Sequence, residues 1–338
     1  MFCLFLDASK AFDRVCHDKM FKCLINNGIC PLILRIIARM YELSSAVVRW
    51  DKSISDSFQL GNGVREGSVL SPFLFSLYLN PLLNEINSSR MGCYIGNTPS
   101  NVFAYADDIV ILAPTVNSLR FLTKILINYS TNFKVTFNPN KSFIIFYSNL
   151  KSNFNFGSNI DINGINFQIV KEGKHLGFQI NNSSNIYDFC NVFGEMSVRT
   201  NVLRSNFYAL DVESKIKLFN SQCMSLYGCE LWNLEDVGIC RIEITWRKCI
   251  KSLLGLPMRT RSKLLPDIIK CNDILTVIYN RQLNFYIRGL SHDDPMINFH
   301  FKNALVSTIS LAAKNIEKIL ERLMLSYSIS INGNRQNL

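Results

Sequence analysis

The sequence predicts an α+β fold in which an antiparallel sheet with helices on one face, a split βαβ-type arrangement, is followed by an all-helical region. Short apolar runs typical of strands occur at Phe2–Leu6, Val102–Ala104 and Ile109–Leu112. Helical patterns separate the first run from the other two. From about Tyr187 onward the patterns are helical only, so we place a boundary near residue 183.

The first elements are marked by their ends. The run at Phe2–Leu6 ends in Asp7, which predicts a strand with a carboxylate at its carboxyl end. His17 begins a helical pattern that Asn27-Gly28 closes, and Pro31 suits the first residue of a second helix. The segments 47–50 and 57–60 predict a hairpin.

Later elements of the first part follow the same signals. Glycines punctuate a loop over residues 61–67, and Ser71-Pro72 precedes a long apolar helix over 73–86, with a bend expected at Pro81. A helix is predicted from Val116 to Phe133. Further strands are expected at 143–147, 160–169 and 175–180.

Two adjacent carboxylates, Asp107 and Asp108, lie between two of the apolar runs, which places them at the tip of a hairpin. Neighbouring like charges raise the pKa of one carboxyl unless a cation lies between them. A solvated turn is the alternative for such a pair. In the split βαβ arrangement Asp7 ends beside this tip, so three carboxylates are expected to converge on one edge of the sheet.

Composition limits the class of protein. The chain has 338 residues, of which 48% are hydrophobic and 18% charged, so it has enough apolar residues for sizeable cores. The formal net charge is +10. This excess suits a polyanionic partner such as nucleic acid, although many basic proteins bind none.

The eleven cysteines form no Cys-x-x-Cys pair and only four histidines are present, so neither a disulfide framework nor a zinc module is expected. The start of the chain lacks the features of a signal peptide, and no apolar stretch reaches about 18 residues. We therefore expect an intracellular protein, in the nucleus, the cytoplasm or both, that does not span a membrane.

Five segments occur in a distinctive order within the first 180 residues: Leu6–Asp13, Gly63–Pro72, Phe103–Asp108, Asn138–Ser142 and Lys174–Gly177. Together they resemble the catalytic motifs of reverse transcriptases from non-LTR (LINE-like) retrotransposons. Two later segments, Tyr227–Trp232 and Leu254–Pro257, look like the helical region that follows in these elements.

The resemblance implies a polymerase palm over residues 1–183, a helical thumb-like region over 184–290 and a C-terminal helical extension with a frayed end over 291–338. Full family members carry a fingers region before the first motif and usually an endonuclease. This chain opens on the first catalytic strand, so we expect it to be truncated at the N-terminus. An uncovered sheet edge or helix face is then expected where fingers would pack.

The resemblance also implies two Mg²⁺ ions, with Mn²⁺ as an alternative, held by Asp7, Asp107 and Asp108. Asp13 is the competing candidate in the first motif, but it lies beyond the turn that follows the strand. Lys141 matches a position thought to protonate the leaving pyrophosphate in related polymerases. A surface lysine in a turn is its alternative role.

The resemblance also implies a nucleotide-binding site, formed by Lys10, Ala11, Phe12, Glu66 and Gly67. The backbone amides of Lys10 and Ala11 would approach the triphosphate, and Phe12 would exclude a 2′-hydroxyl, although an ordinary core role is equally consistent with its sequence. The family commonly has glutamine where this chain has Glu66. An ionised glutamate cannot donate a hydrogen bond and repels phosphate, which puts nucleotide affinity in doubt.

The remaining implied contacts are to nucleic acid. A hairpin that grips the primer end is implied at Lys174, His175, Leu176 and Gly177. Basic residues of the helical region are candidates for contacts to a duplex phosphate backbone, with a solvated helix face as the alternative. They are Arg247, Lys248, Lys251, Arg259, Arg261 and Lys263.

The resemblance thus predicts an RNA-directed DNA polymerase that uses an RNA template, a DNA primer and dNTPs. The alternative is a catalytically inactive truncated remnant that retains only nucleic-acid binding. Because the fingers are expected to be absent, we expect weak or absent activity from the isolated chain.

Overall fold

The computed structural model describes residues 1–148, 157–182 and 189–322. The chain divides into two compact units, Met1–Ser184 and Asn185–Leu338, and each is described by itself. The boundary predicted near residue 183 and the end predicted to be frayed, residues 332–338, lie outside the described residues.

A six-stranded sheet forms the centre of the first unit, in the order β11-β12-β10-β1-β9-β8. These strands are β1 (Phe2–Asp7), β8 (Val102–Tyr105), β9 (Asp108–Ala113), β10 (Phe143–Phe146), β11 (Asn159–Ile162) and β12 (Ile165–Val170). β1 is antiparallel to both of its neighbours, whereas β10 and β12 are parallel. The prediction of a wholly antiparallel sheet is therefore wrong at this pair. A parallel pair needs a long connection, which the segment containing β11 supplies.

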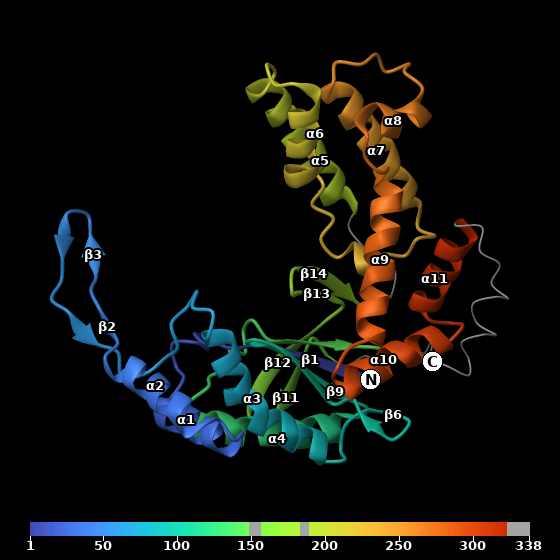
Figure 1. Cartoon of the computed structure of the whole chain (residues 1–338). Coiled ribbons are helices and arrows are strands. Elements are labelled where there is room, and N and C mark those ends of the chain that lie inside the picture. Colours follow the sequence, from blue (N-terminus) through green and yellow to red (C-terminus); the bar gives the residue numbers. More distant parts are fainter. Residues whose placement is uncertain (149–156, 183–188, 323–338) are drawn as a thin grey trace. The chain divides into compact units, whose positions relative to one another are not determined.

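Four helices accompany the sheet: α1 (His17–Asn26), α2 (Pro31–Glu42), α3 (Ser71–Ser88) and α4 (Val116–Phe133). α2 begins at Pro31 and α4 spans the predicted residues. α3 runs through Pro81 as one helix. Figure 1 shows α1, α3 and α4 on the same face of the sheet, as the sequence predicted.

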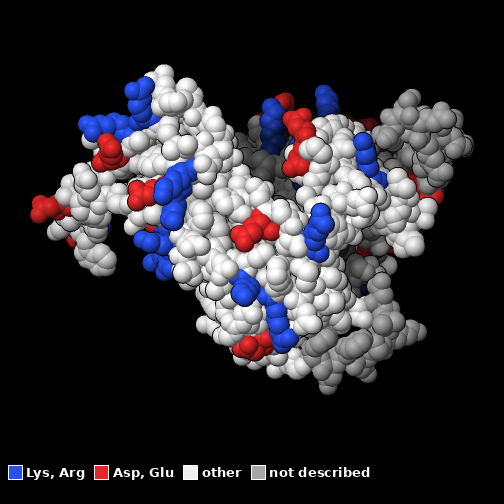
Figure 2. Space-filling model, turned by 90° about the horizontal axis from the view of Figure 1, so that it is seen from below, with Lys and Arg blue, Asp and Glu red and all other residues white. Residues whose placement is uncertain are grey.

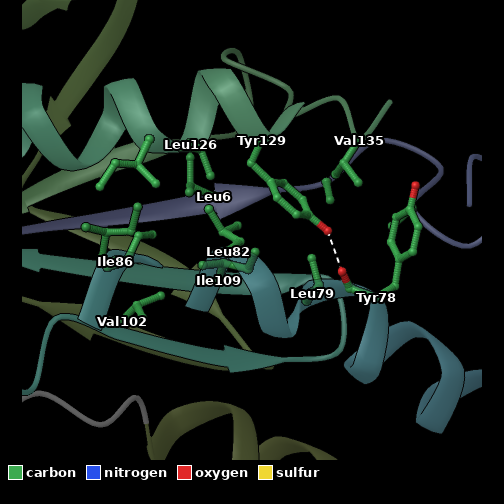
Figure 3. Close-up of a cluster of buried hydrophobic side chains, with 14 of the residues drawn as sticks. Leu6, Tyr78, Leu79, Leu82, Ile86, Val102, Ile109, Leu126, Tyr129 and Val135 are labelled. Carbon is green, nitrogen blue, oxygen red and sulfur yellow. Dashed lines mark hydrogen bonds between the residues drawn. The ribbon is translucent and has the colours of Figure 1, made fainter. Parts of the chain in front are cut away.

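The main core of the first unit lies between the sheet and these helices. Leu6 of β1 and Ile109 of β9 point toward α3 and α4, where Leu82 and Leu126 meet them (Figure 3). The Tyr129 hydroxyl donates a hydrogen bond of 2.6 Å to the Tyr78 carbonyl, which ties α4 to α3. Alternate residues of each strand fill this core, so the residues between them face the opposite side of the sheet.

A smaller apolar cluster of Cys3, Phe5 and Ile145 covers part of that opposite face. The hairpin of β13 (Glu172–His175) and β14 (Phe178–Asn181) contributes Ile180 to it. β1 is consequently buried on both faces, which explains its continuous apolar sequence. The predicted strands 160–169 and 175–180 are thus two hairpins, because turns at Asn163-Gly164 and Leu176-Gly177 interrupt them.

The hairpin between α2 and α3 pairs differently from the prediction. β3 (Arg49–Trp50) pairs with β4 (Ser53–Ile54), and β2 (Ser45–Ala46) pairs with β5 (Phe58–Gln59). The turn at Asp51-Lys52 returns the chain early and shifts the register. A further short hairpin is formed by β6 (Tyr94–Ile95) and β7 (Thr98–Pro99).

Part of the apolar surface of α2 is exposed. Leu32, Ile33, Ile36 and Met40 are all about half exposed or more, whereas Ile37 packs into the core.

The second unit is helical throughout its described part. Its helices are α5 (Phe189–Asn206), α6 (Val212–Gln222), α7 (Val237–Leu253), α8 (Leu265–Ile269), α9 (Ile274–Leu290), α10 (Pro295–Val306) and α11 (Leu311–Arg322). Trp246 of α7 and Ile319 of α11 belong to one core. The buried Asn315 side chain donates to the Trp232 carbonyl and accepts from the Leu234 amide, so α11 is fixed to this unit by side-chain hydrogen bonds.

Among the described helices, none combines the length and the apolar character that crossing a membrane requires.

Candidate active site

The hairpin tip between β8 and β9 carries the adjacent carboxylates. Tyr105 pairs with Asp108 across the ladder, and Ala106 and Asp107 form the two-residue turn between them. Ala106 has φ of 52°, a left-handed conformation that costs an alanine about 1–2 kcal/mol. The predicted hairpin is confirmed, and its tight turn keeps Asp107 next to Asp108.

Asp7 lies directly opposite Asp108, because β1 and β9 pair antiparallel with these two residues in register. Leu6 and Ile109 face the helices, so Asp7 and Asp108 face the other side of the sheet. Phe5 and Val110 lie two residues from Asp7 and Asp108 on the same strands, so they share this face. Both are part of the apolar cluster there. Strand register alone therefore brings together two acids that are distant in the sequence.

The turn that precedes β10 holds the backbone of Asp7. The Asp7 amide donates to the Ser142 hydroxyl at 3.2 Å, and the Asn138 amide donates to the Asp7 carbonyl at 2.8 Å. Ser142 is buried, and its hydroxyl also donates to the Asn138 carbonyl at 2.7 Å. Sequence reasoning assigned a role in this turn only to Lys141. The presence of a small hydroxyl residue next to a strand was the available signal for Ser142.

Lys141 lies near the same carboxylate. Its Nζ is 3.9 Å from Oδ2 of Asp7, and the two side chains are 68% and 40% exposed. An ion pair this exposed contributes little to stability. The structure thus places an exposed cation beside the carboxylates.

His175 lies on the carboxylate face of the sheet. Its ring meets the Phe5 ring edge-on, with 5.0 Å between centroids, and it interacts electrostatically with Asp108. Burial lowers the pKa of His175, and the charge of Asp108 opposes this shift. Leu176 and Gly177 form the turn of this hairpin, both with positive φ, and Lys174 is exposed. The hairpin predicted to grip a primer is therefore next to the carboxylates.

The pKa of Asp108 is raised above its ordinary value. Burial is the largest cause; the His175 charge lowers this pKa, and the charges of Asp107 and Asp7 raise it. Asp108 is thus influenced by both of the other acids. This is the electrostatic conflict that a bound cation would relieve.

The fit of these residues to a metal ion follows from their chemistry. Among residues 1–148, 157–182 and 189–322, no three acidic, histidine or cysteine side chains are already gathered closely enough to hold a metal. Asp7 and Asp108 are nevertheless ladder partners, and Asp107 adjoins them. Magnesium keeps several waters and needs only one or two protein carboxylates, so this donor set suits it.

Phe12 packs against the core. It is half-buried, and its ring stacks on that of the buried Phe75 with 4.9 Å between centroids. Its backbone carbonyl accepts from the Val64 amide at 2.8 Å, and the Gly63 amide donates to the Val15 carbonyl at 2.8 Å. The loops of the first and second motifs are thus joined by backbone hydrogen bonds.

Gly63 is required at this junction. Its φ is 89°, and an added Cβ would lie 2.9 Å from the carbonyl oxygen of Asp13. Asp13 itself is exposed and takes no place in the β1 ladder. This contact could not be predicted from the sequence, because no local pattern indicates which loop approaches a glycine.

The other predicted nucleotide-binding residues divide into buried and exposed groups. Ala11 is buried in the core, so only its backbone remains for a ligand. Lys10, Glu66 and Gly67 are exposed, and Lys10 and Gly67 have positive φ.

The six basic residues predicted in the helical unit have different environments. Lys248, Arg259, Arg261 and Lys263 are exposed. Arg247 forms an ion pair with Glu243 on its own helix. Lys251 is buried, which contradicts its predicted contact with a phosphate backbone, because its ammonium group bonds within the unit instead.

Positive charge is spread over the face of the molecule shown in Figure 2. Lys and Arg side chains there form separate groups, with Asp and Glu and uncharged surface between them. The net charge of +10 is therefore not collected into one strip on that face.

Comparison with known proteins supplies the family. Residues 1–180 match the family described as "Reverse transcriptase (RNA-dependent DNA polymerase)", which is more than half of the chain. The matched segment contains the sheet, the carboxylates and the β13–β14 hairpin.

Curated relatives agree with this match. The chain is 31% identical over 140 residues to the Retrovirus-related Pol polyprotein from type-2 retrotransposable element R2DM of Drosophila melanogaster, covering 41% of this chain and 13% of that protein. It is 24% identical over 276 residues to the RNA-directed DNA polymerase from mobile element jockey of Drosophila funebris, covering 76% of this chain and 29% of that protein. The chain thus spans less than a third of the length of either relative.

Among solved structures, apo telomerase from Candida tropicalis aligns with a TM-score of 0.46 and 13% identity, over 97% of this chain and 52% of that chain. The predicted resemblance to reverse transcriptases of non-LTR retrotransposons is confirmed by the family match and the curated relatives. The chain therefore belongs to the reverse transcriptase (RNA-dependent DNA polymerase) family.

Proposed function

We propose that the first unit is the palm of an RNA-directed DNA polymerase and that Asp7, Asp107 and Asp108 form its catalytic centre. The observation that supports this most strongly is the register of β1 and β9, which sets Asp7 opposite Asp108 beside the turn that contains Asp107. Membership in the reverse transcriptase family supports the proposed reaction, in which an RNA template is copied by adding dNTPs to a primer.

The three carboxylates would hold two divalent cations, which would activate the attacking 3′-hydroxyl and neutralise charge on the transferring phosphate. The chain's own residues support this chemistry. Ser142 and Asn138 fix the backbone of Asp7, and the pairing of β1 with β9 fixes Asp108 opposite Asp7. Preorganised ligands of this kind need little rearrangement when charge develops.

Three further groups have roles in this proposal. Lys141, whose Nζ is 3.9 Å from Asp7, would donate a proton to the leaving pyrophosphate. The β13–β14 hairpin, with His175 beside Asp108, would hold the primer end over the carboxylates. Phe12 would keep its core contact with Phe75 while its exposed edge limits space beneath the sugar.

In the second unit, the exposed residues Lys248, Arg259, Arg261 and Lys263 would contact the phosphate backbone of a template–primer duplex. Such contacts position a duplex without reading its sequence. The second unit would then act as a thumb.

A primer-extension assay tests the proposal, with an RNA template, a DNA primer, dNTPs and Mg²⁺. We expect Asp107→Ala to reduce extension by at least about 100-fold, because it removes a ligand whose charge acts in the transition state. Mn²⁺ binding to the metal-free chain, followed by electron paramagnetic resonance, provides a second measurement that needs no turnover.

The results separate the two functions. Extension by the unaltered chain that Asp107→Ala removes supports the polymerase. Equal extension by both chains would contradict it. Salt-sensitive duplex binding with neither extension nor Mn²⁺ binding would support the alternative, a remnant that only binds nucleic acid.

A further inference from the structure

A loop joins α7 to α8 in the second unit (Figure 1). The side chain of a buried lysine, Lys251, bonds to this loop. Lys251 is 7% exposed, and its Nζ donates to the Met258 carbonyl at 3.0 Å and to the Ser262 hydroxyl at 3.1 Å. Both acceptors belong to this loop, so one ammonium group bonds to it at two points.

The free energy of burying the Lys251 ammonium group argues against a role in packing alone. Both acceptors are uncharged, and none of the ion pairs found in the described ranges includes Lys251. Burying a cation without a carboxylate partner costs free energy that a buried methionine of similar length would avoid. The positive charge at this position therefore calls for a reason beyond packing.

The two anchored residues enclose the most basic part of the loop. Arg259 and Arg261 lie between Met258 and Ser262, and Lys263 follows directly; all three are exposed. The loop has further bonds of its own: the Leu256 amide donates to the Lys251 carbonyl at 2.8 Å, and the Thr260 amide donates to the Pro257 carbonyl at 2.9 Å. A fixed backbone thus presents three cations to solvent.

We propose that Lys251 is a positioning residue that holds this loop so that Arg259, Arg261 and Lys263 engage the phosphates of a nucleic-acid duplex. This inference rests on the proposed nucleic-acid contact of the second unit. A loop already fixed in its bound shape loses less conformational entropy when the duplex binds. Lys251 itself makes no phosphate contact, because it is buried and its ammonium group already bonds to the loop at two points.

Binding of the full chain to a short RNA–DNA hybrid duplex, measured at several salt concentrations, tests this role. We expect Lys251→Met to weaken binding by about tenfold. One phosphate contact contributes about 0.9 to the slope of log affinity against log salt concentration. We expect this slope to fall by more than that amount, because several loop cations lose their positions together. Lys314→Met, at an exposed site on α11, removes the same charge and should change affinity by less than about twofold.

Ser262→Ala provides a variant that removes no charge. It deprives Lys251 of one acceptor, and we expect it to weaken duplex binding several-fold while circular dichroism shows an unchanged fold. If Lys251→Met fails to fold, this variant decides the question. Normal duplex binding by a folded Ser262→Ala chain would then overturn the proposal.

A mutant cycle separates positioning from direct contact. In a chain that already carries Arg259→Ala, Arg261→Ala and Lys263→Ala, Lys251→Met should cause little further loss of affinity. Additive losses, or unchanged binding by Lys251→Met alone, would overturn the inference. If the unaltered chain binds no duplex, the proposed nucleic-acid contact of the second unit is wrong, and the inference falls with it.

Discussion

The two units place their functional residues in different ways. In the first unit, backbone pairing sets Asp7 opposite Asp108 and joins the loops at Gly63. In the second unit, hydrogen bonds from buried polar side chains do this work: Asn315 fixes α11 to the core, and Lys251 fixes the basic loop through the Met258 carbonyl and the Ser262 hydroxyl.

This difference explains why the sequence predicted the two sites unequally. Apolar runs mark the strands, and Asp7 and the Asp107–Asp108 pair stand directly at their ends, so these carboxylates can be assigned to strand ends from local sequence. Whether a lysine on a helix faces solvent or a loop depends on a neighbour that local sequence does not identify. Lys248 and Lys251 lie on the same helix, yet one is exposed and the other buried.

The largest expected effect tests whether backbone pairing selects the metal ligand. Asp7→Asn should weaken Mn²⁺ binding by about 100-fold, because it removes a charged ligand opposite Asp108. Asp13→Asn makes the same change in the same motif at an exposed position and should leave affinity within about twofold. Titration of each chain followed by electron paramagnetic resonance measures both. A larger effect at Asp13 would show that the metal ligand lies outside the paired strands, and that backbone pairing does not select it.

A smaller effect is expected where the two motif loops meet. Gly63→Ala should lower the free energy of unfolding by about 2 kcal/mol, because it combines positive φ with a Cβ placed 2.9 Å from the Asp13 carbonyl oxygen. Urea unfolding followed by circular dichroism measures this change. Gly61→Ala is the matched control, since open space surrounds its Cβ and its φ is not left-handed. Equal stability of the two variants would show that the loop junction is not under this constraint.

The smallest expected effect concerns the charge of Asp108. Burial and the neighbouring acids raise its folded pKa above the ordinary value of 3.8, so the folded state holds the proton more tightly than the unfolded chain. Stability is then lost as pH rises from 3.8 through the folded pKa. Asp108→Asn should therefore stabilise the metal-free chain at pH 7, by less than about 1 kcal/mol because water screens the site.

Thermal unfolding at several pH values measures that difference. The advantage of Asp108→Asn should shrink as the pH falls through the folded pKa and below 3.8, where the carboxyl group of the unaltered chain becomes protonated in both states. Added Mg²⁺ should stabilise the unaltered chain more than the variant. An advantage that does not change with pH would show that the acids do not interact as the structure indicates.

Much of the fold could be predicted from local signals. Pro31 marks the start of α2, Thr115 accepts from the Ser118 amide at the start of α4, and the run at Phe2–Leu6 forms β1. The parallel pairing of β10 with β12 could not be predicted, because it depends on a contact between segments far apart in the sequence. The register of the β2–β5 hairpin also differed, since the turn at Asp51-Lys52 returns the chain early.

The candidate site divides in the same way. The sequence predicted the carboxylates and the hairpin that contains His175, and the structure brings them to one face of the sheet. It did not predict that Ser142 would hold the Asp7 amide or that Phe12 would stack on Phe75. Those contacts need the tertiary arrangement, because each joins segments separated by more than 60 residues.

The sequence by itself determined which residue types stand at strand ends, turns and helix starts, because backbone preferences and hydrophobic periodicity act over a few residues. It thereby determined the family and the acids that carry the proposed chemistry. The tertiary structure decided which polar groups are buried and what they bond to. Packing determines this, because a buried donor such as the Lys251 ammonium group needs acceptors, and the folded chain determines which acceptors are near.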